Sequence, residues 1–155
     1  MPHARYDIDP APGRITGFTL TVDAARSYSD MVAAGNYAEV HPLITQEHFP
    51  VDKAGYDTEA ALLYFGRWIS VTKVLYCLEE QRLRPAVMGE LLAFGAQYPD
   101  SLSEEPIVAL DARWNAPWDD DICALVYPGA NGRSLSVSRT DHGLDNTFQF
   151  LVTPR

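Results

Sequence analysis

The sequence contains four histidines, which are the side chains that most often bind metal ions or transfer protons near neutral pH. They stand at His3, His41, His48 and His142. A zinc site usually starts from two histidines at a fixed helix or hairpin spacing, such as four residues apart on one helix face. No pair here has that spacing. His41 and His48 could meet within one folded loop, but hydrogen-bonded structural histidines are the simpler interpretation, so we expect no metal site.

Motifs for nucleophiles and for phosphate binding are absent from the sequence. It contains no G-x-S-x-G, no G-x-x-x-x-G-K-[ST] and no G-x-G-x-x-G, the spacings that position a serine nucleophile or cradle a nucleotide. Cys77 and Cys123 lie far apart, each at an apolar position of its own pattern. We therefore expect two buried thiols rather than a disulfide or a metal pair, and no cofactor.

Paired carboxylates could act as acid and base or hold a cation. The pairs Glu79-Glu80 and Glu104-Glu105 fit a solvated helix face and a loop. The run 119–121 is three consecutive aspartates that could ligate calcium through loop oxygens. It lacks the alternating acids and the central glycine of a dedicated calcium loop, so no cation is predicted there.

Charge and hydropathy exclude two classes of partner. The chain of 155 residues has a formal net charge of -9 and no run of basic residues, which argues against binding to a nucleic-acid backbone. No stretch approaches the roughly 18 apolar residues of a membrane span, and no signal peptide is recognisable at the start. We expect a protein that is cytoplasmic as synthesised. An acidic mimic of nucleic acid remains an alternative, although the acids are dispersed.

Hydrophobic periodicity predicts one α+β domain over residues 15–155, preceded by an extended, proline-containing arm over 1–14. Alternating apolar residues indicate strands, and i, i+3, i+4, i+7 spacing indicates helices. In chain order we expect a strand at 15–22, a helix at 24–34 capped by Asp23, a loop at 36–55, a strand at 58–68, a helix at 71–82 capped by Ser70, a helix opened by Pro85 and running to 98, and strands at 107–110, 122–127, around 135–137 and at 148–152. We expect the helices to pack on one side of a twisted, mostly antiparallel sheet of short strands.

The C-terminal third is rich in short polar side chains that alternate with apolar ones. The apolar positions 135, 137, 144, 148 and 150 can face a core while the polar ones point outward together. This composition is typical of recognition surfaces, and equally of any solvated face of an antiparallel hairpin. The candidate ligand-binding residues here are Ser134, Ser136, Ser138, Arg139, Thr140, Asp141, His142, Asp145, Asn146, Thr147 and Gln149.

Five blocks of the sequence are distinctive: RSYSDMVAAGNY at 26–37, ITQEHFP at 44–50, RPAVMGELLAFG at 84–95, IVAL at 107–110 and FQFLV at 148–152. Together they resemble a family of small uncharacterised proteins of candidate bacterial phyla. The resemblance spans nearly the whole chain, and the blocks carry no chemistry of their own. The chain differs from that family around 139–144, where it reads RTDHGL instead of an aromatic-rich stretch.

A helix bearing R-P-A-x-x-x-E-L-L at 84–92 is followed by short strands and a closing F-x-F-L-V strand. This layout is similar to that of the variable proteins of diversity-generating retroelements, which have a C-type-lectin-like fold. In such proteins adenine-directed mutation of AAY codons never produces Lys, Glu, Gln, Met or Trp, and residues 119–148 contain none of these five. The resemblance implies a C-type-lectin-like fold with diversified residues just before the last strand.

We therefore expect a ligand-binding module rather than an enzyme, with an unidentified protein or cell-surface ligand as partner. Aromatic and Arg anchors would supply affinity, and short polar residues would set specificity. The flanking candidates are Trp114, Asn115, Trp118 and Asp119. The alternative is an enzyme or accessory factor with a dispersed site. That site would be assembled from His48, Asp120, Arg139 and His142.

Overall fold

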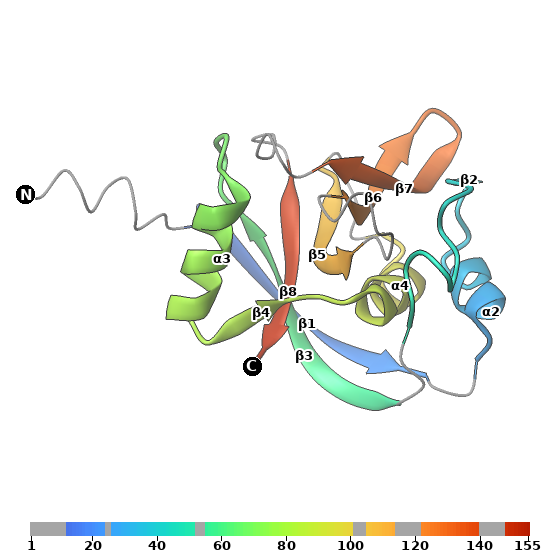
Figure 1. The fold of residues 1–155 in the computed structure, drawn as a ribbon, viewed down its shortest axis with the longest axis horizontal. Helices are drawn as coiled ribbons and strands as arrows, with labels where there is room; N and C mark the ends of the chain where they lie inside the picture. Colours follow the sequence, from blue (N-terminus) through green and yellow to red (C-terminus); the bar gives the residue numbers. More distant parts are fainter. Residues whose placement is uncertain (1–11, 24–25, 52–54, 101–104, 114–121, 140–147) are drawn as a thin grey trace, which may run out of the picture.

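The computed structural model describes residues 12–23, 26–51, 55–100, 105–113, 122–139 and 148–155, with the side chains of 111–113 and 122 left out. Figure 1 shows the helices and strands along the chain. They are β1 (Arg14–Val22), α2 (Tyr28–Ala33), β2 (Glu39–Val40), β3 (Tyr56–Tyr64), α3 (Val71–Glu80), β4 (Leu83–Pro85), α4 (Met88–Gln97), β5 (Ile107–Arg113), β6 (Ile122–Gly129), β7 (Gly132–Arg139) and β8 (Gln149–Pro154). The α+β class predicted from the sequence is confirmed.

All the described strands belong to one sheet in the order β1-β3-β8-β5-β6-β7-β2, with β4 paired to β8 outside this path. Most neighbours are antiparallel, but β8 is parallel to β5 and β2 is parallel to β7. The last strand of the chain therefore lies in the middle of the sheet, between β3 and β5. The C-terminal strands therefore do not pair in chain order, because β8 follows β7 in the sequence but lies on the far side of β5.

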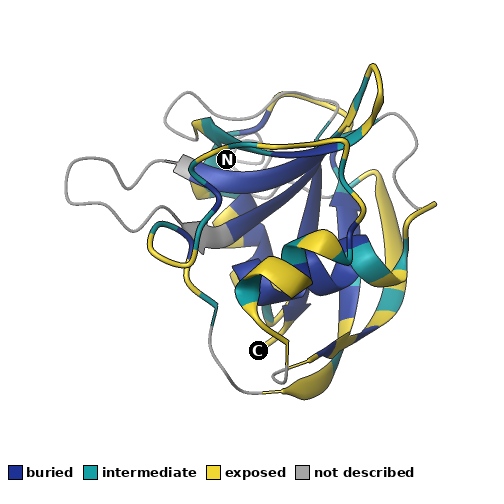
Figure 2. Cartoon of the chain, turned by 90° about the vertical axis from the view of Figure 1, so that its right-hand side faces the viewer, coloured by how far each residue is buried: buried dark blue, intermediate teal, exposed yellow. Residues whose placement is uncertain are grey.

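Helices cover both faces of the sheet, so the expectation that they pack on one side is also wrong. Leu62 and Leu151 face a core cluster that includes Leu91 of α4, whereas their neighbours Leu63 and Phe150 face a second cluster built on α3. Successive residues of a strand point to opposite faces, which is why neighbours in sequence enter different cores. Figure 1 shows α3 and α4 on opposite sides of β8, and Figure 2 shows largely buried strands behind α2, whose outer side is exposed.

Capping residues set the helix boundaries. Ser70 accepts a hydrogen bond from the Lys73 amide at the start of α3, as its sequence predicts. Ser27, not Asp23, caps α2, which is therefore shorter than expected. Pro85 does not open a helix. It lies in β4 opposite Val152, because a proline can occupy a sheet edge that requires no amide.

The predicted strand at 58–68 is shifted and ends at Tyr64. Gly66 follows with φ +73, a conformation that favours glycine and turns the chain away. The expected loop at 36–55 contains the two-residue strand β2. Among the described residues, no helix has the length and apolar character needed to cross a membrane.

Candidate functional site

The predicted binding surface is built on the β6–β7 hairpin. The two strands pair from Ile122 opposite Arg139 to Gly129 opposite Gly132. Only two residues connect them, and Gly132 has φ +125, a backbone angle that residues with a side chain rarely adopt. A Cβ atom on Gly129 would lie 2.9 Å from the Gly132 carbonyl oxygen. Both glycines are therefore required by a tight turn, which fixes the register of the hairpin.

Arg133 fastens this hairpin to two helices. Its guanidinium donates to the carbonyl of Gly35, just after α2, and lies 2.8 Å from the carbonyl of Gly95 in α4. The same group lies 5.1 Å from the ring centroid of Tyr37. Two carbonyls and an aromatic ring thus hold the start of β7, so the hairpin is a braced platform.

The serines of β7 share one face of the sheet. Ser134, Ser136 and Ser138 stand opposite Tyr127, Leu125 and Cys123 in the β6 register. These β6 residues contact the cluster on the α3 side, whereas Leu135 and Val137 contact the cluster on the α4 side. Ser136 and Ser138 are half-buried and Arg139 is exposed. The described part of the predicted surface is therefore this strand end.

Two of the predicted outward residues are buried instead, and this corrects the predicted surface. Ser134 is 4% exposed and Gln149 is 5% exposed. Gln149 lies in a central strand between Tyr64 and Ile107, and the two core clusters cover both faces of that strand. It also faces the α4 side, opposite to the β7 serines. The sequence alternation indicated a solvated face because it cannot distinguish an edge strand from a central one.

The other predicted ligand-binding residues lie outside the described part of the chain. They are Trp114, Asn115, Trp118, Asp119, Thr140, Asp141, His142, Asp145, Asn146 and Thr147, and the candidate calcium run 119–121 also falls there. Their attachment points are nevertheless described. Arg113 pairs with Cys123, and Ile122 pairs with Arg139. Segments 114–121 and 140–147 therefore depart from neighbouring positions at one end of β5, β6 and β7.

The histidines and cysteines have structural surroundings where they are described. The Nδ1 atom of His48 lies 3.0 Å from the hydroxyl of Thr45, and His41 Nδ1 accepts from the Leu43 amide. Both cysteines are buried, as expected. Desolvation raises the pKa of Cys123 to about 12, which leaves it a poor nucleophile. Asp120 and His142 of the alternative enzyme site lie outside the described residues. Among the residues that are described, no group of three or more His, Cys, Asp or Glu side chains could hold a metal ion.

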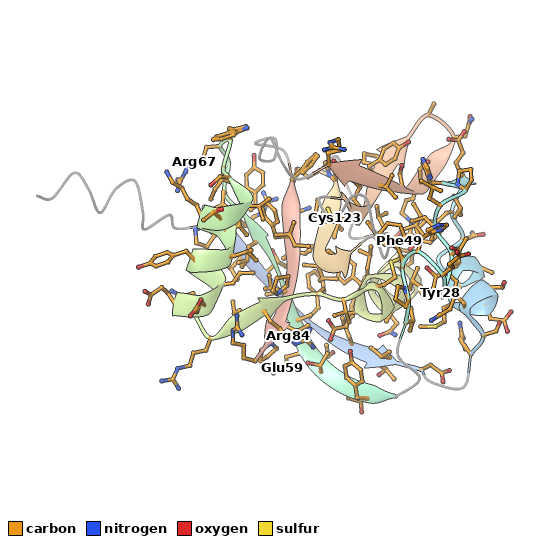
Figure 3. All side chains as sticks on the ribbon, viewed as in Figure 1. Tyr28, Phe49, Glu59, Arg67, Arg84 and Cys123 are labelled. Carbon is orange, nitrogen blue, oxygen red and sulfur yellow. The ribbon has the colours of Figure 1, made fainter. Side chains whose placement is uncertain are left out.

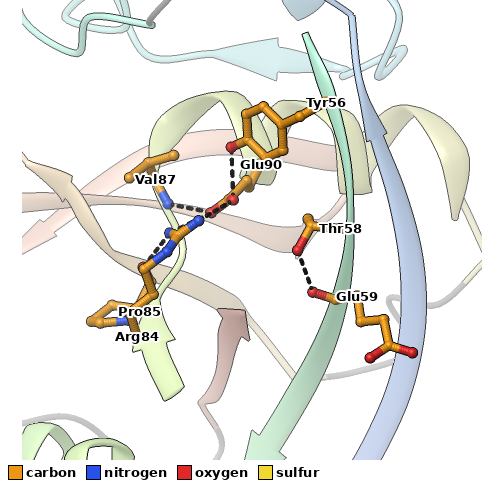
Figure 4. Close-up of polar contacts among 7 residues, drawn as sticks. All are labelled: Tyr56, Thr58, Glu59, Arg84, Pro85, Val87 and Glu90. Carbon is orange, nitrogen blue, oxygen red and sulfur yellow. Dashed lines mark hydrogen bonds and ion pairs between the residues drawn. The ribbon is translucent and has the colours of Figure 1, made fainter. Parts of the chain in front are cut away.

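A buried carboxylate network, which the sequence analysis missed, joins β3, β4 and α4. Glu90 is fully buried in α4 and accepts from Arg84 at 3.0 and 2.6 Å. Its Oε2 atom also lies 2.7 Å from the Tyr56 hydroxyl, and its Oε1 atom lies 3.0 Å from the Val87 amide (Figure 4). Burial, followed by the hydrogen bond to Glu90, raises the pKa of Tyr56 to about 12. The signal in the sequence was a lone glutamate inside an apolar helix, which needs a partner when buried.

A cleft of about 620 Å³ extends from β1 across β3 to residues of β8 and β4. Figure 3 labels Glu59 and Arg84 at this end of the sheet. The walls combine apolar side chains with one carboxylate. They are formed by Gly17, Phe18, Thr19, Glu59, Ala60, Ala61, Leu83, Tyr98, Val152, Thr153 and Pro154. No local pattern indicated this cleft, because residues from four strands form it.

No protein-family model, curated protein or solved structure matches the chain.

Proposed function

We propose that the protein is a ligand-binding module that presents the end of β5, β6 and β7 to a protein or cell-surface ligand. One observation carries this proposal: residues 113, 122 and 139, from which the two predicted binding segments depart, are neighbours in the sheet register. The described residues that flank segments 114–121 and 140–147, which are at least 19 residues apart in sequence, thus lie at the same end of the sheet. Binding residues are often carried by segments that a rigid scaffold positions.

The residues assigned to the surface have the composition that recognition requires. Ser136 and Ser138 are half-buried on one face, and Arg139 is exposed at the strand end. Short hydroxyl side chains adapt to many partners, whereas arginine supplies a strong anchor. Ser134 and Gln149 belong to the scaffold in this proposal, because they are buried. The remaining contacts come from the candidate residues of segments 114–121 and 140–147.

The finer proposal is a C-type-lectin-like variable protein of a diversity-generating retroelement. Its support is the block layout of the sequence and the lack of Lys, Glu, Gln, Met and Trp between residues 119 and 148. The source genome provides a direct check. A reverse-transcriptase gene beside a near-copy of the 3′ end of this gene, differing at adenines, is the expected arrangement. A genome without either would remove the retroelement assignment and leave the binding module.

Panning of a displayed library tests the binding function. Positions 136, 138, 140, 142 and 146 are randomised, and the library is panned against one purified, immobilised protein. We expect enrichment of binders whose selected residues fall at these positions and whose binding is lost when they revert to the parent sequence. A matched library randomised on the exposed positions 72, 75, 76 and 79 of α3 serves as control. Equal enrichment from both libraries would contradict a specialised surface.

A further inference from the structure

β3 and β8 pair over only part of their length, so the first half of β3 has no described neighbouring strand on the side that faces β8. β8 pairs with β3 from Gln149 to Val152, and with β4 from Val152 to Pro154 on its opposite side. The β3 partners end at Ala61, so no described strand pairs with residues 56–60 on the side away from β1. We name this place the fork. The 620 Å³ cleft adjoins the fork, because its lining includes residues 59–61 of β3 and 152–154 of β8 as well as residues 17–19 of β1.

The outer edge of the sheet shows which β3 groups face the fork. The main chain of Thr21 bonds to the side chain of Gln97, and that of Thr19 bonds to the hydroxyl of Tyr98, on the β1 side away from β3. The main-chain groups of Thr19 and Thr21 therefore point away from β3. In the register of the two strands, Thr21 stands opposite Asp57 and Thr19 opposite Glu59. Because main-chain groups alternate in direction along a strand, the amides and carbonyls of Asp57 and Glu59 point away from β1, into the fork.

One of these fork-facing groups is already engaged. The Thr58 hydroxyl lies 3.0 Å from the Glu59 carbonyl oxygen (Figure 4). No partner is found within the described residues for the fork-facing amides of Asp57 and Glu59. An unpaired strand edge is a template for another extended chain. The outer edge of β1 differs, because α4 side chains cover its Thr19 and Thr21 positions.

The walls of the fork define the chemistry of what it can bind. Ala61, Val152 and Leu83 supply an apolar wall, and Glu59 is the charged side chain among the lining residues. Glu59 and Ala61 point to the same face of β3. An apolar cleft with few polar groups and a single carboxylate suits a ligand with apolar side chains beside a cation.

We propose that the fork binds an extended segment of a partner protein in which Lys or Arg alternates with small apolar residues, and that this segment adds as a strand to β3. Its main chain pairs with Asp57 and Glu59, one basic side chain lies against Glu59, and apolar side chains pack on Ala61, Val152 and Leu83. Main-chain pairing supplies affinity and the alternating side chains supply specificity. The fork is distinct from the β5–β7 surface, so its failure would leave the proposed function intact.

Gly17 offers a clean way to block the fork. It lines the cleft, and a Cβ atom there would meet nothing within 4 Å. We therefore expect the side chain of Gly17→Leu to project into the cleft. Thr16→Leu adds similar bulk at an exposed position on the opposite face of the same strand, and it is the matched control. Glu59→Gln removes the cleft carboxylate, and Asp57→Asn removes a nearby exposed carboxylate outside the lining.

The probe is the acetylated and amidated peptide Val-Lys-Val-Lys-Val, labelled with a fluorophore and titrated by anisotropy. We expect Gly17→Leu to weaken binding roughly tenfold or more, and Thr16→Leu to leave Kd within about twofold. Glu59→Gln should weaken it by up to about fivefold, as one exposed charge pair allows, and Asp57→Asn less. Equal effects of Gly17→Leu and Thr16→Leu, or tighter binding of the corresponding Val-Glu-Val-Glu-Val peptide, would overturn the proposal.

Hydrogen exchange gives a second readout that a side-chain contact alone would not change. With the peptide bound, the amides of Asp57 and Glu59 should exchange more slowly, because they then donate to the added strand. Unchanged exchange at both amides would overturn strand addition. A small amine, 4-phenylbutylamine, is the third arm. Binding of this amine, measured by calorimetry, without any binding of the peptide would assign the fork to small molecules and overturn the proposal as well.

Discussion

Arg84 on β4 and Glu90 on α4 form a two-point ion pair, with nitrogen to oxygen distances of 3.0 and 2.6 Å. Glu90 is fully buried, whereas the Arg84 side chain is 30% exposed. The carboxylate thus depends on an arginine that reaches it from another element, and the hydrogen bond to Glu90 is the largest cause that raises the pKa of Arg84. The pair connects α4 to β4, the short strand that pairs with β8.

Removal of Arg84 should destabilise the fold more than removal of both partners. We expect Arg84→Met to lower the free energy of unfolding by about 3 kcal/mol, because it leaves a buried carboxylate without its cation. The double variant Arg84→Met with Glu90→Leu should recover a large part of that loss. Urea unfolding followed by circular dichroism measures both. If the double variant were no more stable than the single one, the network would have to stabilise the fold by more than compensation of the buried charge.

The close approach of Tyr37 to α4 predicts that Gly95 cannot be replaced. A Cβ atom on Gly95 would overlap the Tyr37 hydroxyl, and one on Gly35 would overlap its ring. Gly95→Ala should therefore lower the free energy of unfolding by about 2 kcal/mol, within the range of overpacked sites. Gly17→Ala is the control, since its Cβ would meet open space. Thermal melts of the two variants should differ clearly, and similar melting temperatures would contradict the packing described for Tyr37.

The helix side chains on the outer edge of β1 should keep the chain from self-association. The Gln97 amide both donates to the Thr21 carbonyl at 2.6 Å and accepts from its amide at 3.1 Å, and Tyr98 bonds similarly to Thr19. A strand edge covered in this way cannot pair with another chain. We expect the Gln97→Ala, Tyr98→Phe variant to sediment as larger species with rising concentration. The Gln81→Ala variant serves as control, and a monomeric double variant would contradict this role of α4.

Local patterns predicted those features whose cause is local. Ser70 and the apolar spacing after it predicted α3 to within two residues, and the alternation at 15–22 predicted β1 to within one. Pro85 was misassigned because its role depends on pairing with Val152, a residue 67 positions later. Gln149 was misassigned for the same kind of reason, since only the insertion of β8 between β3 and β5 buries it. The fork could not be foreseen because it exists only where long-range pairings end.

Stability should fall in alkaline solution, partly through Cys123. Its ordinary pKa of 9.0 is raised to about 12 by burial. Between these two values the unfolded chain releases the thiol proton while the folded chain retains it, so unfolding becomes more favourable as pH rises. We expect wild type to lose up to about 1 kcal/mol per pH unit more than Cys123→Ala across this window. Urea unfolding at several pH values under reducing conditions measures the slopes, and parallel slopes would contradict a buried thiol.

The tolerance of the β7 end to substitution tests the proposed recognition surface most directly. One library randomises positions 136, 138, 140, 142 and 146, and a second randomises the buried positions 134, 135, 149 and 151. Both are displayed, and the fraction of variants that resists protease is measured. We predict that most members of the first library remain folded and that few members of the second do. If most members of the first library lost protease resistance, these residues would belong to the core, and the proposed function would be contradicted.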